Sequence, residues 1–406
     1  MLACSRQVVS KSDPLPVDGL REMVEPANPF LNRHSLEAAT AWVDEALDAL
    51  DRQDAPLRTA RGLMLLEDIR AIQPIPAEDR AAVDGFAVQA SASLGASVYN
   101  PIRFPSIAVA GGDALPAGTD AVVPRELAEP NGESHIEVVE AVAAADNVER
   151  QGAVATIEAT LVRAGTRLAA RHIGLLLMAG ISRVAVVRRP RVRVLIIKPT
   201  KAGGWVDSNG PMIGAAVDRD GGVISESVAV ERSPTAIAAA LVKTGVDIVL
   251  VMGGTGRGVD DHAAAALAAV GQLAVHGVAL LPGETTGLGQ TVGGVPVVLL
   301  PGAPAACLWS YELLAGRAIR RLGGRHPELP FRSREVITTR KIVSSLGMAE
   351  ICPVRFGDGE AVEPLPSFAE IGLMGAVGAD GFVIVPQGSE GFPGGARITV
   401  HLYGEC

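Results

Sequence analysis

VRVLII (residues 192–197), IVLVM (248–252) and VPVVLL (295–300) are three strand-like runs that recur within one stretch of this 406-residue chain. Each run is so uniformly apolar that it has no wet face, which is typical of a parallel strand covered on both sides. Helical patterns separate the runs. Ser208 or Asn209 is placed to cap one helix, and Ser233, followed by a proline, to start another. The alternation of strand and helix predicts a central, doubly wound, mostly parallel sheet.

The rest of the chain divides by composition around this centre. Prolines without sustained periodicity predict an extended N-terminal arm, and short alternating runs broken by glycines predict small β lobes before and after the sheet. Ser35 is a plausible cap for a helix that precedes the first lobe. We therefore predict an α/β plus β, multidomain chain: an arm (1–34), N-terminal helical and β lobes (35–188), an α/β domain (189–325) and a C-terminal β barrel (326–406).

Composition excludes several classes of function. The net charge of −9 argues against a surface for nucleic acid or membrane lipid, and an aromatic fraction of 3% argues against base stacking. No apolar run approaches the ~18–20 residues of a membrane span. The four cysteines, at positions 4, 307, 352 and 406, have no metal-binding spacing and indicate no disulfide framework. A cytoplasmic location fits these features best.

A glycine-rich loop follows the run 248–252 directly. It consists of Gly253, Gly254, Thr255, Gly256 and Arg257, with a further glycine after them. At the carboxyl end of a parallel strand, glycines let backbone N–H groups approach an anion, and the threonine and arginine add donors. A tight strand-to-helix turn explains the same glycines, so both interpretations stay open.

Two more helix starts fall at the same edge of the predicted sheet. Ser208 and Asn209 precede one helix, and Pro301 and Gly302 end the last apolar run before another. Capping alone would account for the first pair. Three helix starts on one rim, however, predict a pocket for a phosphorylated ligand.

Two aspartates are candidates for metal binding. Asp261 precedes an alanine-rich helix, where an acid either favours the positive helix end or holds Mg²⁺ against a bound phosphate. Asp84 lies in an apolar, glycine-containing turn, and its local sequence favours an ordinary turn residue over a ligand.

From about Ser35 to its C-terminus, the chain resembles the molybdopterin molybdenumtransferases, the MoeA type that includes the E domain of gephyrin. The matching segments are AVDGFA (82–87), LPAGTDAVV (115–123), RPRV (189–192), DSN (207–209), GG (253–254) with Asp261, and LPGAP (300–304). The resemblance implies a homodimer that inserts molybdenum from molybdate into adenylylated molybdopterin, using Mg²⁺. It implies catalytic and metal roles for Asp84 and Asp261, and ligand contacts from the three helix starts.

The chain departs from the family at several positions, two of which carry a lysine in the family. Leu281 and Glu284 stand where the family has two lysines, and Ala303 and Ala306 stand where it has Asn and Ser. The family's Gly-Asp-Glu is replaced by KPTK (198–201) or close to it, and a family threonine aligns with Gly111. These departures leave three hypotheses: an insertase in which Lys198 or Lys201 replaces the lost cations, a carrier that binds molybdopterin without inserting molybdenum, and a nucleotide-pyrophosphate hydrolase using the same pocket.

Overall fold

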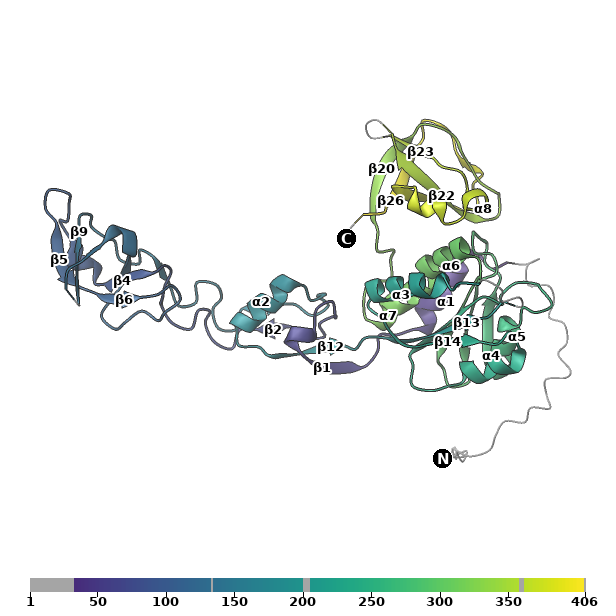
Figure 1. Ribbon diagram of the computed structural model, residues 1–406, viewed down its shortest axis with the longest axis horizontal. Helices are drawn as coiled ribbons and strands as arrows, with labels where there is room; N and C mark the ends of the chain where they lie inside the picture. Colours follow the sequence, from purple (N-terminus) through teal and green to yellow (C-terminus); the bar gives the residue numbers. More distant parts are fainter. Residues whose placement is uncertain (1–32, 133, 200–204, 358–360, 405–406) are drawn as a thin grey trace, which may run out of the picture. The chain divides into compact units, whose positions relative to one another are not determined.

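The computed structural model describes residues 33–132, 134–199, 205–357 and 361–404 (Figure 1). The chain forms two compact units. One joins the segment up to Ala49 with the segment from Arg189 onward, and the other spans Leu50–Arg188. Residues 1–32 of the predicted N-terminal arm (1–34), and Lys201, lie outside the described residues. No helix in the described ranges combines the length and apolar character needed to cross a membrane.

A six-stranded mixed sheet forms the centre of the first unit, in the order β14-β13-β15-β19-β18-β16. Neighbours among β13, β14, β15 and β19 pair in parallel, and β16 and β18 add an antiparallel edge. The mostly parallel sheet predicted from the apolar runs is confirmed. The strands are β13 (Arg191–Ile197), β14 (Val223–Val230), β15 (Ile248–Met252), β16 (Gly271–His276), β18 (Gly287–Thr291) and β19 (Pro296–Leu300).

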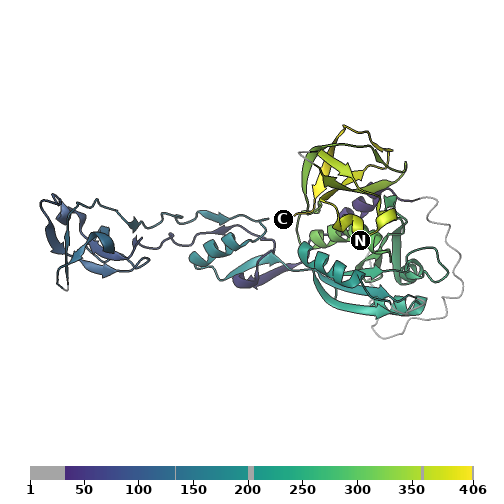
Figure 2. The same ribbon diagram turned by 45° about the horizontal axis from the view of Figure 1, so that its top comes forward.

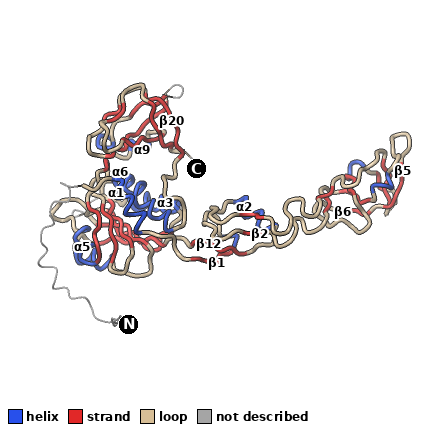
Figure 3. Tube along the Cα trace, turned by 180° about the vertical axis from the view of Figure 1, so that it is seen from behind, coloured by secondary structure: helices blue, strands red, loops and turns tan. Residues whose placement is uncertain are grey.

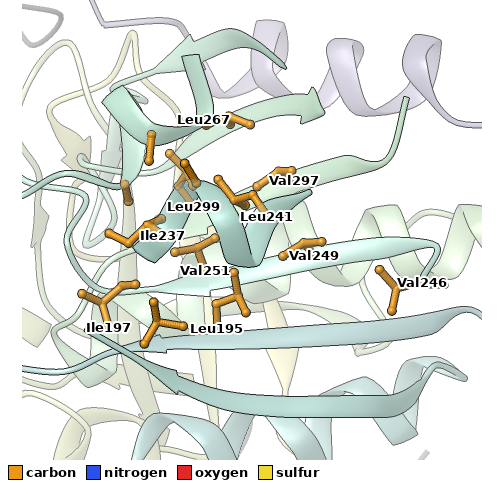
Figure 4. Close-up of a cluster of buried hydrophobic side chains, with 14 residues drawn as sticks. Leu195, Ile197, Ile237, Leu241, Val246, Val249, Val251, Leu267, Val297 and Leu299 are labelled. Atoms are coloured by element: carbon orange, nitrogen blue, oxygen red, sulfur yellow. The ribbon is translucent and has the colours of Figure 1, made fainter. Parts of the chain in front are cut away.

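Helices cover both faces of this sheet (Figures 1 and 2). α4 (Pro234–Leu241) and α5 (Ala263–Val270) lie on one face. On the other lie α3 (Asn209–Asp220) and a continuous helix made of α6 (Pro304–Ser310), the π turn η5 (Tyr311–Ala315) and α7 (Gly316–Leu322). On the face covered by α4 and α5, alternate strand residues such as Leu195, Val251 and Leu299 pack against the helices. Their partners include Ile237 of α4 and Leu267 of α5, and together these side chains form the apolar cluster shown in Figure 4.

Of the two helix caps predicted for the α/β domain, one is confirmed and the other is wrong. Ser233 caps α4 as predicted, because its side chain accepts a hydrogen bond from the backbone N–H of Ala236. Ser208 precedes α3 but makes no such bond. The carboxylate of Asp207 takes this role, since its Oδ1 accepts from the N–H of Gly210 at 2.9 Å. The prediction that Ser208 or Asn209 caps α3 is therefore wrong.

Helix α1 (Leu36–Ala46) begins at the predicted cap, Ser35. The sequence-based division places this helix with the N-terminal lobes, whereas the structure groups it with the α/β domain. The reason is a contact with α7: Arg317 Nε donates to Asp44 Oδ1 at 2.8 Å, and Arg321 Nη2 donates to the carbonyl oxygen of Leu47 at 2.8 Å.

A buried charge cluster joins α3 to η5 and α7. Asp220 is 1% exposed and contacts Arg219, Arg320 and the hydroxyl of Tyr311. Arg219 also pairs with Glu312, whose pKa is raised because burial disfavours its charged form. Paired in this way, the charges tie the two helices together in the core.

The C-terminal barrel closes because β22 (Ala349–Phe356) pairs with both β23 (Ala361–Pro364) and β24 (Gly381–Val385). β20 (Arg332–Thr338) and β26 (Arg397–Leu402) complete the ring. The predicted barrel is thus confirmed. Short β17 (Leu280–Leu281) of the α/β domain adds to β22 in parallel, so the turn that follows β17 faces this barrel.

The second unit consists largely of short strands and loops (Figure 3). One part packs α2 (Ala170–Met178) against β1 (Arg52–Pro56) and β12 (Arg183–Val187). The other holds the predicted antiparallel lobe, with two three-stranded sheets. Their strands are β4 (Gly85–Val88), β6 (Ile107–Val109) and β7 (Ala121–Pro124), and β5 (Ile102–Pro105), β8 (Glu129–Pro130) and β9 (His135–Val138).

Candidate functional site

A cavity of about 400 Å³ opens at the carboxyl edge of the parallel strands. It brings together four of the predicted residues, Ser208, Asn209, Gly253 and Gly302. Two of the predicted helix starts, those of α3 and α6, thus meet in this cavity, and the glycine loop contributes its first residue. The remaining lining residues are Ile196, Ile197, Pro199, Trp205, Val206, Asp207, Arg232, Met252 and Pro304. We call this space the strand-edge cavity.

Asn209 links two walls of the strand-edge cavity. Its side-chain Nδ2 donates to the carbonyl oxygen of Gly302 at 2.9 Å, while its buried Oδ1 has no hydrogen-bond partner among the described residues. An unpaired buried acceptor is costly, so this oxygen is suited to a ligand N–H. The Asp207 carboxylate lines the same cavity, so the site offers two acceptors on neighbouring residues.

The glycine loop contributes less to the cavity than predicted. Gly253 lines it, but its N–H donates to the carbonyl oxygen of Leu300 at 2.9 Å. Thr255 is 2% exposed and its hydroxyl contacts Thr285, so it packs inside the domain. Gly254, Thr255, Gly256, Arg257 and Pro301 do not appear among the residues that line the cavity. Positive φ angles of 88° at Gly253 and 68° at Gly254 fit the tight-turn interpretation.

Arg232 is a cavity residue that sequence reasoning missed. It follows β14 and comes directly before the cap of α4, so it lies at the same edge as the three predicted helix starts. Its place between a parallel strand and the next helix could have identified Arg232 as a cavity residue from the sequence. Its Nε donates to the carbonyl oxygen of Lys198 at 3.0 Å and its Nη1 to Asp261 Oδ1 at 2.9 Å.

Asp261 is occupied by protein groups on both oxygens. Oδ1 pairs with Arg232, and Oδ2 accepts from the N–H of Gly258 at 2.9 Å. Magnesium prefers near-octahedral oxygen coordination from carboxylates and waters, and a guanidinium beside the carboxylate repels it. The described residues contain no group of three or more His, Cys, Asp or Glu placed to hold a metal ion, and segment 200–204 has no acid. With both of its oxygens bonded to protein donors and a guanidinium beside it, Asp261 does not fit a magnesium site.

Asp84 belongs to the second compact unit. Its Oδ1 accepts from the N–H of Gly111 at 2.7 Å, which holds the turn between β3 (Arg80–Ala81) and β4. This contact fits the ordinary turn role that the local sequence favours. Pairing of Asp84 with Asp261 at a metal stays a prediction.

Lys198 is committed to a surface ion pair. Its Nζ lies 2.6 Å from Glu231 Oε1, and both side chains are largely exposed. Lys198 is also not among the described residues that line the strand-edge cavity.

A second cavity, of about 580 Å³, lies between the α/β domain and the barrel, and we call it the barrel-side cavity. It gathers four of the departures from the family pattern, Leu281, Glu284, Ala303 and Ala306, and Pro304 lines both cavities. Its two acids are Glu284 and Glu350. None of the described residues that line it is a lysine or arginine; the others are Pro282, Ala305, Ile351, Phe368, Ala369, Gly372 and Leu373.

Neither acid of the barrel-side cavity has a cationic partner within the described part of the chain. Glu284 accepts from the N–H of Gly283 at 3.2 Å, and Glu350 accepts from Ser344 and from the N–H of Ser345. Cys307 lies in α6, the helix whose first residue, Pro304, lines both cavities. Burial raises the pKa of its thiol to about 12, so this cysteine is not a nucleophile. The barrel-side cavity is therefore apolar and acidic.

Comparison with known proteins gives matches along most of the chain. Residues 34–180 match the MoeA N-terminal region (domain I and II), and residues 185–321 match a probable molybdopterin binding domain. Among curated proteins, molybdopterin molybdenumtransferase of Bacillus subtilis is 27% identical and covers 98% of this chain and 96% of its own length. Molybdopterin molybdenumtransferase 1 of Mycobacterium tuberculosis is 26% identical, with 90% and 98% covered.

Solved structures give the same relationship. A molybdopterin biosynthesis MoeA protein from Pyrococcus horikosii is 26% identical and has a TM-score of 0.71. The match covers 92% of this chain and 100% of the solved chain. The similarity thus includes both compact units.

Proposed function

This chain belongs to the MoeA family, and from that premise we propose that it acts in molybdenum cofactor biosynthesis by binding molybdopterin, with only a weak hold on molybdate. The ligand occupies the strand-edge cavity. The amino and ring N–H groups of a pterin are donors, which match the free Oδ1 of Asn209 and the carboxylate of Asp207. Arg232 lines the same cavity and suits the ligand's phosphate.

One observation carries the second half of the proposal. Leu281, Glu284, Ala303 and Ala306, four of the positions at which the chain departs from its family, line a single cavity. This cavity contains two carboxylates and no lysine or arginine among its described lining residues. Molybdate is a doubly charged anion and needs charge-assisted donors to be held. The described residues that line the barrel-side cavity supply no cationic donor. A carrier of molybdopterin is therefore favoured over an efficient insertase.

The proposal includes a homodimer, which the family resemblance implies. Sedimentation of the full chain at micromolar concentration is expected to give twice the 41.8 kDa chain mass. A species of 41.8 kDa alone would contradict this part of the proposal.

Retention of pterin by the purified full-length protein tests the ligand. After oxidation, a fluorescent pterin is expected in near-stoichiometric amount, and Asn209→Leu is expected to lower it about tenfold because the amide contacts are lost. Asn100→Leu is the matched control, since the Asn100 amide also donates to a glycine carbonyl but lies in the other compact unit. Equal loss in both variants would refute the assignment of the cavity.

Transfer of molybdenum to the apo form of a molybdenum enzyme separates the carrier from the insertase. Supplied with adenylylated molybdopterin and micromolar molybdate, the protein is expected to activate the enzyme slowly or not at all. Rapid activation would establish an insertase instead.

A further inference from the structure

Arg232 is held in a fixed position at the strand-edge cavity. The guanidinium is anchored at Nε by the carbonyl oxygen of Lys198 and at Nη1 by Asp261, and its side chain is 23% exposed. Among the described residues, no protein acceptor contacts Nη2. An arginine whose fork is already oriented loses little conformational freedom when it binds a phosphate.

The charge pattern around the cavity sets what Arg232 can recognise. Of the residues that line it, Asp207 and Arg232 carry charge. Among the described residues that line the cavity, Arg232 is the positively charged one, so its remaining donor is the group offered to an anion. Planar N–H donors match phosphate oxygens in geometry as well as in charge.

Asp261 fixes the orientation of the Arg232 guanidinium. Its carboxylate connects Nη1 of Arg232 to the N–H of Gly258, and so joins the residue after β14 to the loop after β15. With Oδ1 and Oδ2 both committed, Asp261 orients the guanidinium rather than binding a ligand itself.

We propose that Arg232 performs the charge neutralisation for which the family resemblance calls on Mg²⁺, so that the ligand's phosphate is recognised by this arginine without a metal. Asp261 is then a positioning residue. The inference rests on the proposed binding of molybdopterin in the strand-edge cavity, and it goes beyond that function by naming the group that selects the phosphate.

Binding of oxidised, fluorescent molybdopterin and of its dephosphorylated counterpart to the full-length protein tests the inference. The phosphorylated form is expected to bind at least about tenfold more tightly, equally in EDTA and in millimolar Mg²⁺. Arg232→Met is expected to remove this preference, and Arg232→Lys to restore part of it. A preference that requires Mg²⁺, or that persists in Arg232→Met, would overturn the inference.

Two comparisons make the result specific. Arg183→Met is the matched control, because Arg183 also bonds one carboxylate and one carbonyl oxygen, both of Asp54. Asp261→Asn is expected to weaken the phosphate preference in the wild-type background but to add nothing to Arg232→Met, which is the result for a residue acting through Arg232. Additive losses would refute the positioning role. Failure of both pterin forms to bind would refute the proposed function itself.

Discussion

Restoring positive charge to the barrel-side cavity should create a molybdate site. The perturbation is Leu281→Lys with Glu284→Lys, at two positions that lie on one turn and line the same cavity. In the native chain, Glu284 has a backbone N–H partner and no cationic partner among the described residues. A molybdate ion in this cavity therefore meets uncompensated negative charge from Glu284 and from Glu350.

The size of the effect follows from Coulomb's law. One like-charge contact at ~4 Å costs about 4 kcal/mol at an effective dielectric of ~20. Glu284 is only partly buried, so we halve the figure for solvent screening to about 2 kcal/mol, equivalent to about 30-fold in affinity. This exceeds the net value of one neutral hydrogen bond, about 1 kcal/mol. The double substitution is therefore expected to tighten molybdate binding by at least about 30-fold.

Calorimetric titration with molybdate measures the change directly. Glu284→Lys is compared with Glu129→Lys, which alters the net charge equally at an exposed site in the other compact unit. The gain should shrink in about 1 M salt, where the Debye length is ~3 Å. Micromolar molybdate affinity in the unmodified protein, or an equal gain from Glu129→Lys, would refute the reasoning.

Three predictions concern stability and are checked by chemical unfolding. Asp220→Asn should lower the free energy of unfolding by about 3–5 kcal/mol, because the buried guanidinium of Arg320 loses its acidic partner, whereas the exposed Asp218→Asn should have little effect. Gly253→Ala should cost about 1–2 kcal/mol, since alanine disfavours a φ of 88°; unchanged stability would mean that the loop relaxes freely. Burial lowers the pKa of His276, so the unfolded state binds more protons, and the free energy of unfolding should fall as pH drops from about 7 to 5. His276→Gln should flatten part of this slope, and an unaltered slope would exclude His276 as its source.

Local sequence was sufficient for the elements of the central sheet. The runs at 192–197 and 248–252 lie within or coincide with β13 and β15, because a strand buried on both faces must be apolar at every position. Ser233 was also identified as a cap, since the Ser-Pro pair carries its own conformational preference. The departures at Leu281 and Glu284 were visible as residues, although their meeting with Ala303 in one cavity was not.

Only the tertiary structure decided which of several candidate side chains caps α3 and which residues pair at the strand-edge cavity. Asp207, Ser208 and Asn209 are all capping residue types, and the backbone conformation at the start of α3 selected Asp207 while turning Asn209 toward Gly302. Arg232 and Asp261 are 29 residues apart and meet because β14 and β15 end at the same edge of the sheet. An ion pair between distant residues depends on strand order and side-chain direction, neither of which leaves a periodic signal in the sequence.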